Sequence, residues 1–152
     1  MNNLTVGTPV GAWYETIGGG AGAGPGFAGA HGVQVHMTNT RATDVEELEA
    51  RFPVVLEAWR RRRGSGGRGA FSGGDGVEKI WRFLEGATVA MMAERRVVGA
   101  RGASGGEAGA PGEDDHDRGA GFSPAPHRWT ARPGDRLRVR TPGGGGWGVG
   151  GA

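Results

Sequence analysis

Glycine is concentrated in a few stretches of this sequence, and these stretches constrain its fold most strongly. The first contains Gly18-Gly19-Gly20 and Pro25-Gly26, and further stretches follow at 64–77, 105–112 and 142–148. Glycine permits a positive φ and close approach of another backbone or a ligand, but it costs conformational entropy. The first stretch leads directly into the polar tract 36–41, which is unusual for a linker. We therefore interpret it as a specific backbone path or a binding site.

The rest of the composition predicts a single domain with a thin core. The chain has 152 residues, 34 of them glycine, and few large aliphatic residues, so we expect it to gain stability by packing on another body. It contains no cysteine, which excludes disulfides and thiolate metal ligands. No apolar run approaches the length of a membrane span, and we expect a soluble, cytoplasmic protein.

The charge balance does not indicate a nucleic-acid-binding protein. The formal net charge is only +2, although the pI is about 9.9. Every basic side chain other than Lys79 is arginine, which pairs well with carboxylates and phosphates. Arg60–Arg63 and the glycines at 64–69 resemble an RNA-binding Gly/Arg tract, but the unit does not repeat, so we favour solvated or paired arginines at a strand end.

Alternating apolar and polar residues predict several strands. The predicted strands are 10–17, 32–38, 54–63, 77–85, 87–95 and 137–141, with Glu85-Gly86 as a hairpin turn between the fourth and fifth. Thr43 and Glu46 form a capping box, which predicts a short helix that ends before Pro53. The fold class is therefore α+β: β-rich, with antiparallel strands, long glycine-rich loops and a short helix.

Two polar clusters leave alternatives open. His36 and Thr38 share one side of the predicted strand 32–38; they line a site, or they bond loop backbone that needs partners. Arg95 and its neighbours Glu94 and Arg96 bind a substrate carboxylate or phosphate, or they form a structural ion pair. The acidic run 113–117 has metal-ligand residue types, but adjacent loop residues do not converge on one ion without a turn.

The sequence resembles the hydantoinase B/oxoprolinase family over nearly its whole length. The resemblance rests on MNNLT at 1–5, ETIGGG at 15–20, HMTNTR at 36–41 and PGDRLRVRTPGGGGWG at 133–148. The family includes ATP-dependent 5-oxoprolinases, N-methylhydantoinases and acetone carboxylase subunits, which are usually several times longer. The resemblance implies that residues 1–152 are the C-terminal portion of a B-type domain whose amino-terminal part is absent.

The resemblance also implies a function, which is ATP-dependent opening of a cyclic amide such as 5-oxoproline or a hydantoin. It implies substrate-binding or site-supporting roles for Glu15, His36, Asn39, Thr40 and Arg95, and it assigns no general base and no metal. ATP and Mg²⁺ belong to an A-type partner, which agrees with the lack of a P-loop here. The alternatives are a non-catalytic scaffold that completes a larger enzyme and, less favoured, an RNA-binding protein.

Overall fold

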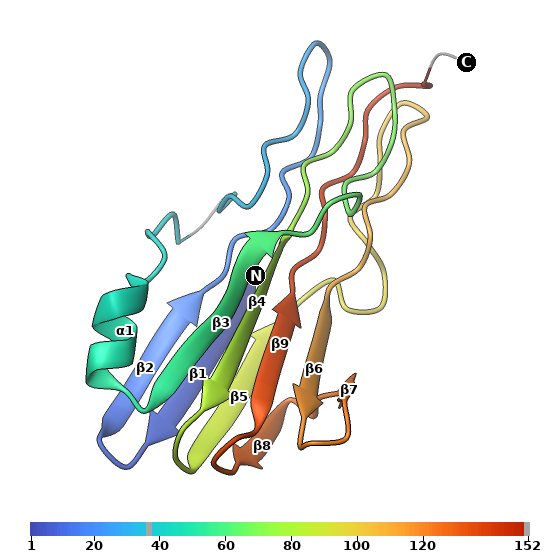
Figure 1. The fold of residues 1–152 in the computed structure, drawn as a ribbon. Coiled ribbons are helices and arrows are strands. Elements are labelled where there is room, and N and C mark those ends of the chain that lie inside the picture. The colour runs from blue at the N-terminus through green and yellow to red at the C-terminus, as the bar shows by residue number, and fades with distance from the viewer. Residues whose placement is uncertain (36–37, 151–152) are drawn as a thin grey trace.

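The computed structural model describes residues 1–35 and 38–150, which form two antiparallel β-sheets and one helix (Figure 1). The first sheet has the order β2-β1-β5-β8 and contains β1 (Asn2–Thr8), β2 (Gly11–Thr16), β5 (Ala87–Ala93) and β8 (Arg128–Ala131). The second has the order β3-β4-β9-β6-β7 and contains β3 (Val54–Arg61), β4 (Val77–Phe83), β6 (Glu113–Asp117), β7 (Phe122–Pro124) and β9 (Arg136–Arg140). The predicted β-rich, antiparallel architecture with a short helix is confirmed.

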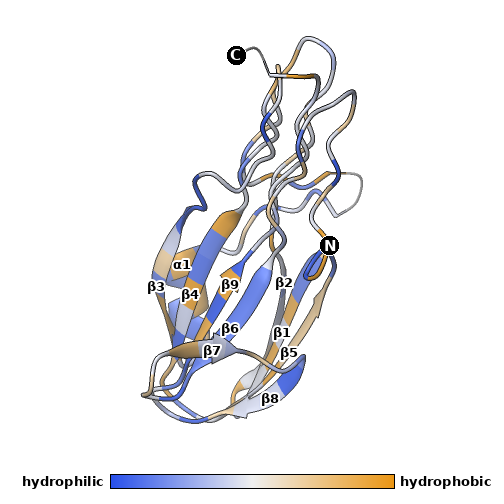
Figure 2. Cartoon of the chain, turned by 90° about the vertical axis from the view of Figure 1, so that its right-hand side faces the viewer, coloured by the Kyte–Doolittle hydropathy of each residue, from blue (hydrophilic) through white to orange (hydrophobic). Residues whose placement is uncertain are grey.

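The hydrophobic core lies between the two sheets. Alternate residues of each strand point inward, such as Leu4 and Val6 of β1, and both are completely buried. Trp81 of β4 is also completely buried. Phe83 and Trp129 meet edge to face across the core, with ring centroids 6.0 Å apart. In Figure 2, apolar and polar colours alternate along these strands, as expected for sheets with one buried side.

The predicted hairpin between residues 77–85 and 87–95 is wrong. The two strands form, but β4 pairs with β3 and β9, whereas β5 pairs with β1 and β8. The turn at Glu85-Gly86 therefore carries the chain from one sheet to the other. Alternation shows which side of a strand is buried, but it does not show which strand is its neighbour. The strand β1, which pairs with β2 and β5, was not predicted at all.

The predicted helix is present as α1 (Val45–Arg51), with a different capping residue. Asp44, not Thr43, is the N-cap: its Oδ1 accepts hydrogen bonds from the backbone nitrogens of Glu46 at 3.0 Å and Glu47 at 3.1 Å. The helix ends before Pro53, as predicted. It buries Leu48. The helix contacts β3, and in Figure 1 it lies beside β2 at the edge of the sandwich.

The glycine-rich segments extend from one end of the sandwich and run side by side (Figures 1 and 2). We call residues 18–33, 64–76, 99–112 and 141–148 the glycine bundle. Their backbones hydrogen-bond from segment to segment: Gly74 donates to Ala21 O at 2.8 Å, and Gly144 donates to Gly74 O at 2.9 Å. The segments therefore satisfy one another's backbone groups, which isolated loops leave to water.

Glycine is required inside this bundle because the backbones are in direct contact. A Cβ added to Gly20 would overlap the carbonyl group of Gly74 and lie 2.5 Å from the nitrogen of Gly144. A Cβ on Gly144 would in turn overlap the carbonyl group of Ala21. Collagen uses glycine for the same reason, since no side chain fits where its three chains meet.

Two further expectations need correction. The predicted strand 32–38 does not form in the described residues, where Val33 makes only an isolated bridge with Gly19; Gly32 and Thr38 have positive φ angles of 58° and 72°, which interrupt an extended strand. His36, which the prediction placed on this strand, lies outside the described residues. The acidic run 113–117, treated above as loop residues, forms the strand β6, which pairs with β7 and β9.

Candidate functional site

A polar cavity of about 230 Å³ opens where the sandwich meets the glycine bundle. Three regions enclose it: the end of β2 with the first glycine segment, the tract that leads to α1, and the facing ends of β3 and β4. Its lining residues are Glu15, Thr16, Ile17, Gly18, Gly32, Val33, Gln34, Asn39, Thr40, Ala42, Trp59, Val77 and Lys79. The cavity therefore combines residues that are far apart in the sequence.

A buried ion pair between the two sheets forms one wall of the cavity. Glu15 points inward from β2 and Lys79 points inward from β4, and the side chain of each is 3% exposed. Lys79 Nζ donates to Glu15 Oε1. Lys79 Nζ also lies 4.3 Å from the ring centroid of Trp59, an attractive cation–π distance. Removing one partner would leave the other charge buried and uncompensated.

The second carboxylate oxygen of Glu15 has no hydrogen-bond partner. Glu15 Oε2 is buried, and no protein donor reaches it in the described part of the chain. Buried polar atoms are nearly always hydrogen-bonded, so an unpaired carboxylate oxygen at a cavity needs an explanation. Glu15 Oε2 is thus a buried acceptor without a donor among the described residues.

The tract before α1 is attached to the end of β2 by side-chain hydrogen bonds. The hydroxyl oxygens of Thr16 and Thr40 are 3.0 Å apart. Gln34 Nε2 donates to the backbone oxygen of Thr16 at 2.9 Å. These contacts hold the exposed Asn39 and Thr40 at the edge of the cavity. The polar side chains thus line the opening, whereas the ion pair lies deeper.

Gly18 and Gly32 line the cavity at its junction with the glycine bundle, and the buried Thr141 contacts Gly18 without lining the cavity. The Thr141 hydroxyl donates to Gly18 O at 2.9 Å and accepts from the backbone nitrogen of Val77 at 2.8 Å. A Cβ on Gly18 would lie 2.8 Å from Gly32 O, so a larger residue here would push the two segments apart. The glycine bundle therefore holds this end of the cavity at a defined width.

The structure brings three of the five predicted site residues together. Glu15, Asn39 and Thr40 all line the cavity. Arg95 does not line it: this residue follows β5 with a φ of 59°, and its Nη1 donates to Gly99 O at 3.4 Å. His36 lies outside the described residues. The functional roles of all five remain predictions.

Sequence reasoning missed four lining residues with polar or aromatic side chains: Thr16, Gln34, Trp59 and Lys79. Lys79 carried a usable signal, because the alternation placed the only lysine on the same side as Trp81, which is apolar and buried. A charge on a buried side requires a partner of opposite charge. The acidic partner from β2 was not evident, since it comes from the other sheet.

The acidic run 113–117 forms a strand in which three alternate carboxylates pair with arginines of β9, whereas Asp114 pairs with Arg96. Asp115 accepts from Arg138 Nη2 at 2.8 Å, and Asp117 accepts from Arg136. The hydrogen bond from Arg136 lowers the pKa of Asp117 below its usual value. Within the described residues, no group of three or more His, Asp or Glu side chains could hold a metal ion.

The arginine run 60–63 is also used within the chain. Arg60 Nε donates to Glu78 Oε1 at 2.7 Å. Arg62 donates to Pro111 O at 2.6 Å and to Glu113. Burial lowers the pKa of the Arg62 guanidinium, and the charge of Glu113 opposes this shift. These ion pairs agree with the interpretation of paired arginines and argue against an RNA-binding tract.

These features define a class of domain: a β-sandwich extended by a glycine bundle, with a polar cavity at their junction. The family model of hydantoinase B/oxoprolinase matches residues 1–149. The chain is 54% identical to the 5-oxoprolinase of Dictyostelium discoideum over 107 residues, which are 70% of this chain and 8% of that protein. It is 44% identical to 5-oxoprolinase 1 of Arabidopsis thaliana over 151 residues, which are 97% of this chain and 12% of that protein. The chain belongs to the hydantoinase B/oxoprolinase family.

Solved structures share the fold. The ATP-dependent caprolactamase from Pseudomonas jessenii matches with a TM-score of 0.80 and 25% sequence identity, over 97% of this chain and 28% of that chain. Nucleotide-free acetone carboxylase matches with a TM-score of 0.73 and 17% identity, which shows the fold alone. This chain thus spans about a tenth of the two curated relatives named above and about a quarter of the solved chains. Among the described residues, no helix is long and apolar enough to cross a membrane.

Proposed function

We propose that this chain is part of an ATP-dependent hydrolase that opens a cyclic amide, with 5-oxoproline as the first substrate to test. It acts together with the remainder of a B-type subunit and with an A-type subunit or domain that handles ATP and Mg²⁺. The observation that carries the proposal is the 44% identity to an Arabidopsis 5-oxoprolinase across 97% of the chain. The match covers only 12% of that protein, which supports the need for the other parts.

The chemistry explains why ATP is needed. A lactam is a poor electrophile because amide resonance stabilises its carbonyl group. Transfer of the γ-phosphoryl group to the amide oxygen makes the ring carbon reactive toward water, and the ring C–N bond then breaks. Over the whole reaction, 5-oxoproline, ATP and two molecules of water give glutamate, ADP and phosphate.

In this proposal the cavity residues anchor and orient a reacting group. Glu15 Oε2 accepts a hydrogen bond from a donor, and the Asn39 amide and the Thr40 hydroxyl supply contacts at the opening. His36 extends the same polar tract. Arg95 acts from a separate position, on the segment after β5, as an anchor for a carboxylate or phosphate.

A hybrid enzyme tests the proposal. The region of Arabidopsis 5-oxoprolinase 1 that matches this chain is replaced by the chain, and ATP-dependent glutamate release is measured. We expect activity, and we expect Asn39→Ala and Thr40→Val to lower kcat/KM by about 10- to 100-fold, the value of one polar contact. Ser123→Ala is the matched control, because Ser123 is exposed on β7, away from the cavity.

Two outcomes would change the proposal. A hybrid with the parent's activity but no effect of Asn39→Ala or Thr40→Val would identify the chain as a non-catalytic scaffold. A soluble, folded hybrid that releases no glutamate would contradict a role in 5-oxoproline opening. In that case caprolactam would be tested next, because a structural relative is an ATP-dependent caprolactamase.

A further inference from the structure

The two outer faces of the sandwich differ in charge. The outward positions of β9 and β6 carry a ladder of ion pairs, including Arg138 with Asp115 and Arg140 with Glu113. On the same face, Arg82 of β4 donates to Glu57 at 2.7 Å. Arg138 and Arg140 remain 22% and 26% exposed, and covering this face would remove their charges from water, which is costly even for paired groups. We therefore expect this charged face to remain exposed to solvent.

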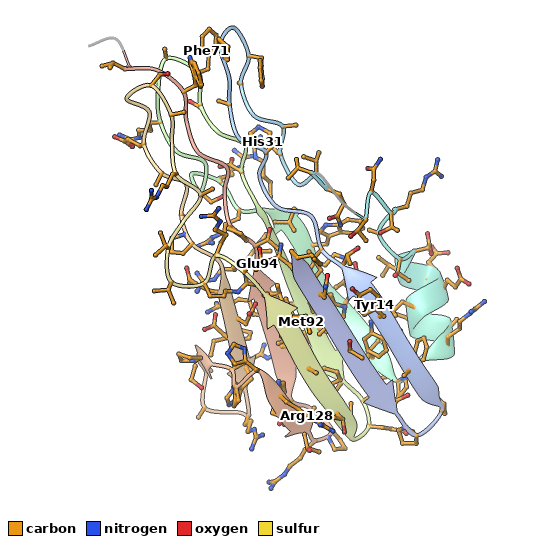
Figure 3. All side chains as sticks on the ribbon, turned by 180° about the vertical axis from the view of Figure 1, so that it is seen from behind. Tyr14, His31, Phe71, Met92, Glu94 and Arg128 are labelled. Carbon is orange, nitrogen blue, oxygen red and sulfur yellow. The ribbon has the colours of Figure 1, made fainter. Side chains whose placement is uncertain are left out.

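The outer face of the first sheet is nearly uncharged. We call it the neutral face; its central residues are Thr5, Gly7, Tyr14, Thr88, Ala90 and Met92. Among the outward positions of its described strands, the one formal charge is that of Arg128 in β8, at the sheet edge. Figure 3 looks onto this face and labels Tyr14, Met92 and Arg128. Tyr14 is 57% exposed and Met92 is 74% exposed.

Gly7 has a conformation and surroundings that do not require glycine. It lies within β1, it has no positive φ, and none of the described residues comes within 4 Å of where its Cβ would be. It forms part of a shallow depression with Thr88 and Thr130. Glycine weakens a strand interior, and it often marks a place where another backbone approaches closely. Residues 1–35 and 38–150 supply no such backbone at Gly7.

We propose that the neutral face is an interaction surface for the part of a hydantoinase B-type subunit that has no counterpart in this chain. The occupant presents an uncharged, largely apolar surface and brings backbone close to Gly7. Interface centres are depleted in charged residues, as this face is, and Tyr14 and Met92 are of residue types enriched there. The inference deepens the proposed function and rests on its assembly with the rest of a B-type subunit.

The relatives favour this occupant over a second copy of the chain. In the caprolactamase, the matched region is 28% of one continuous chain, so the remainder is covalently attached to the matching sandwich. A tethered segment has an effective concentration in the millimolar range when its linker spans the site. A second copy at micromolar concentration would compete poorly for the same face.

A binding experiment with matched variants tests the proposal. Arabidopsis 5-oxoprolinase 1 without the matched region is titrated with this chain by calorimetry. Ala90 and Ala58 are both half-buried and point outward, Ala90 on the neutral face and Ala58 on the charged face. We expect Ala90→Glu to weaken binding about 10-fold or more by burying an unpaired charge, and Ala58→Glu to change it less than about 2-fold.

Gly7→Thr gives a second, sharper test. In the isolated chain it should leave the melting temperature unchanged or raise it, because threonine suits a strand and meets no clash. In the complex it should weaken binding about 10-fold or more. Loss of binding with preserved stability cannot come from misfolding.

The outcomes separate the inference from the proposed function. Equal effects of Ala90→Glu and Ala58→Glu, an unchanged affinity of Gly7→Thr, or no binding of the wild-type chain would overturn the inference. So would a homodimer, seen by light scattering, that Ala90→Glu dissociates. Should the truncated relative fail to fold, the same variants are compared in the covalent hybrid, where Gly7→Thr must lower the melting temperature. Binding that the variants weaken, without glutamate release by the hybrid, would support the interaction surface and contradict the proposed function. Glutamate release by the hybrid, with binding that the variants do not affect, would support the proposed function and contradict the interaction surface.

Discussion

The sandwich and the glycine bundle are stabilised in opposite ways. In the sandwich, large side chains such as Trp81 and Leu137 fill the space between the sheets. In the bundle, backbones touch directly, and Gly20, Gly74 and Gly144 leave no space for a methyl group. The first region is sensitive to the removal of atoms and the second to their addition. The candidate cavity lies where the two regions meet, so both determine its shape.

The largest effect is expected in the sandwich. Trp81→Ala should lower the free energy of unfolding by about 3–5 kcal/mol, because it leaves a cavity between the sheets. Urea denaturation followed by circular dichroism measures the change. A loss below about 1 kcal/mol would mean that Trp81 is not a central core residue, and the contrast with the bundle would fail.

The Glu15–Lys79 ion pair lies where the sandwich meets the glycine bundle. Removing one partner should destabilise the chain, and removing both should restore most of the stability. Lys79→Met should cost about 3–5 kcal/mol, because it leaves the Glu15 charge buried without a partner. Adding Glu15→Leu should restore most of the loss, since a hydrophobic pair of similar volume often replaces a buried ion pair at little cost. Equal instability of the single and double variants in urea would show that packing, rather than charge, dominates here.

In the glycine bundle, adding one carbon should be enough to destabilise the chain. Gly20→Ala should cost about 1–3 kcal/mol or more, because the new Cβ overlaps the Gly74 carbonyl group. Gly22→Ala is the control: its Cβ would have its nearest neighbour, Gly145 O, at 3.9 Å, and the change should stay within about 0.5 kcal/mol. Similar thermal shifts for both variants would contradict direct backbone contact in the bundle.

The smallest expected effect is a pH-dependent change in stability that comes from the Asp117–Arg136 ion pair of the sandwich. Arg136 lowers the pKa of Asp117 below its usual value of 3.8, so the folded state favours the carboxylate. The resulting stability is present above that value and is lost as the pH falls through the lower folded pKa. Asp117→Asn should therefore be less stable than wild type near neutral pH, and the difference should shrink below about pH 4.

Thermal unfolding at several pH values measures this difference. The loss caused by Gly20→Ala serves as the reference, because a steric overlap between backbone and a methyl group does not titrate. A pH-independent difference for Asp117→Asn would show that its ion pair contributes nothing to stability.

The sequence predicted the positions of the helix and the strands better than it predicted which strands pair. Alternation identified the strands at 54–63, 77–85 and 137–141, and a polar cap followed by a proline identified α1. The pairing of β4 and β5 was wrong, because alternation carries no information about neighbouring strands. The bundle was not evident as a unit, since segments without side chains leave no periodic pattern. The strand at 113–117 looked like an acidic loop because its arginine partners follow about twenty residues later.

The candidate site was predicted only in part, because local sequence patterns do not show which strands pack against one another. A resemblance in local motifs singled out Glu15, Asn39 and Thr40, which the fold brings to one cavity. Lys79 and Trp59 reach that cavity from the opposite sheet. Their role depends on sheet packing, which local motifs do not encode. Arg95 was chosen by the same resemblance, but the fold positions it elsewhere.

The most direct test of the central claim is the joint release of glutamate and phosphate from 5-oxoproline and ATP. It compares the hybrid enzyme that carries this chain with the same relative lacking the matched region. We predict that the hybrid releases both products in equal amounts, that omission of ATP abolishes glutamate release, and that the truncated relative releases no glutamate. Glutamate release by the truncated relative at the rate of the hybrid would contradict a role for this chain in the reaction.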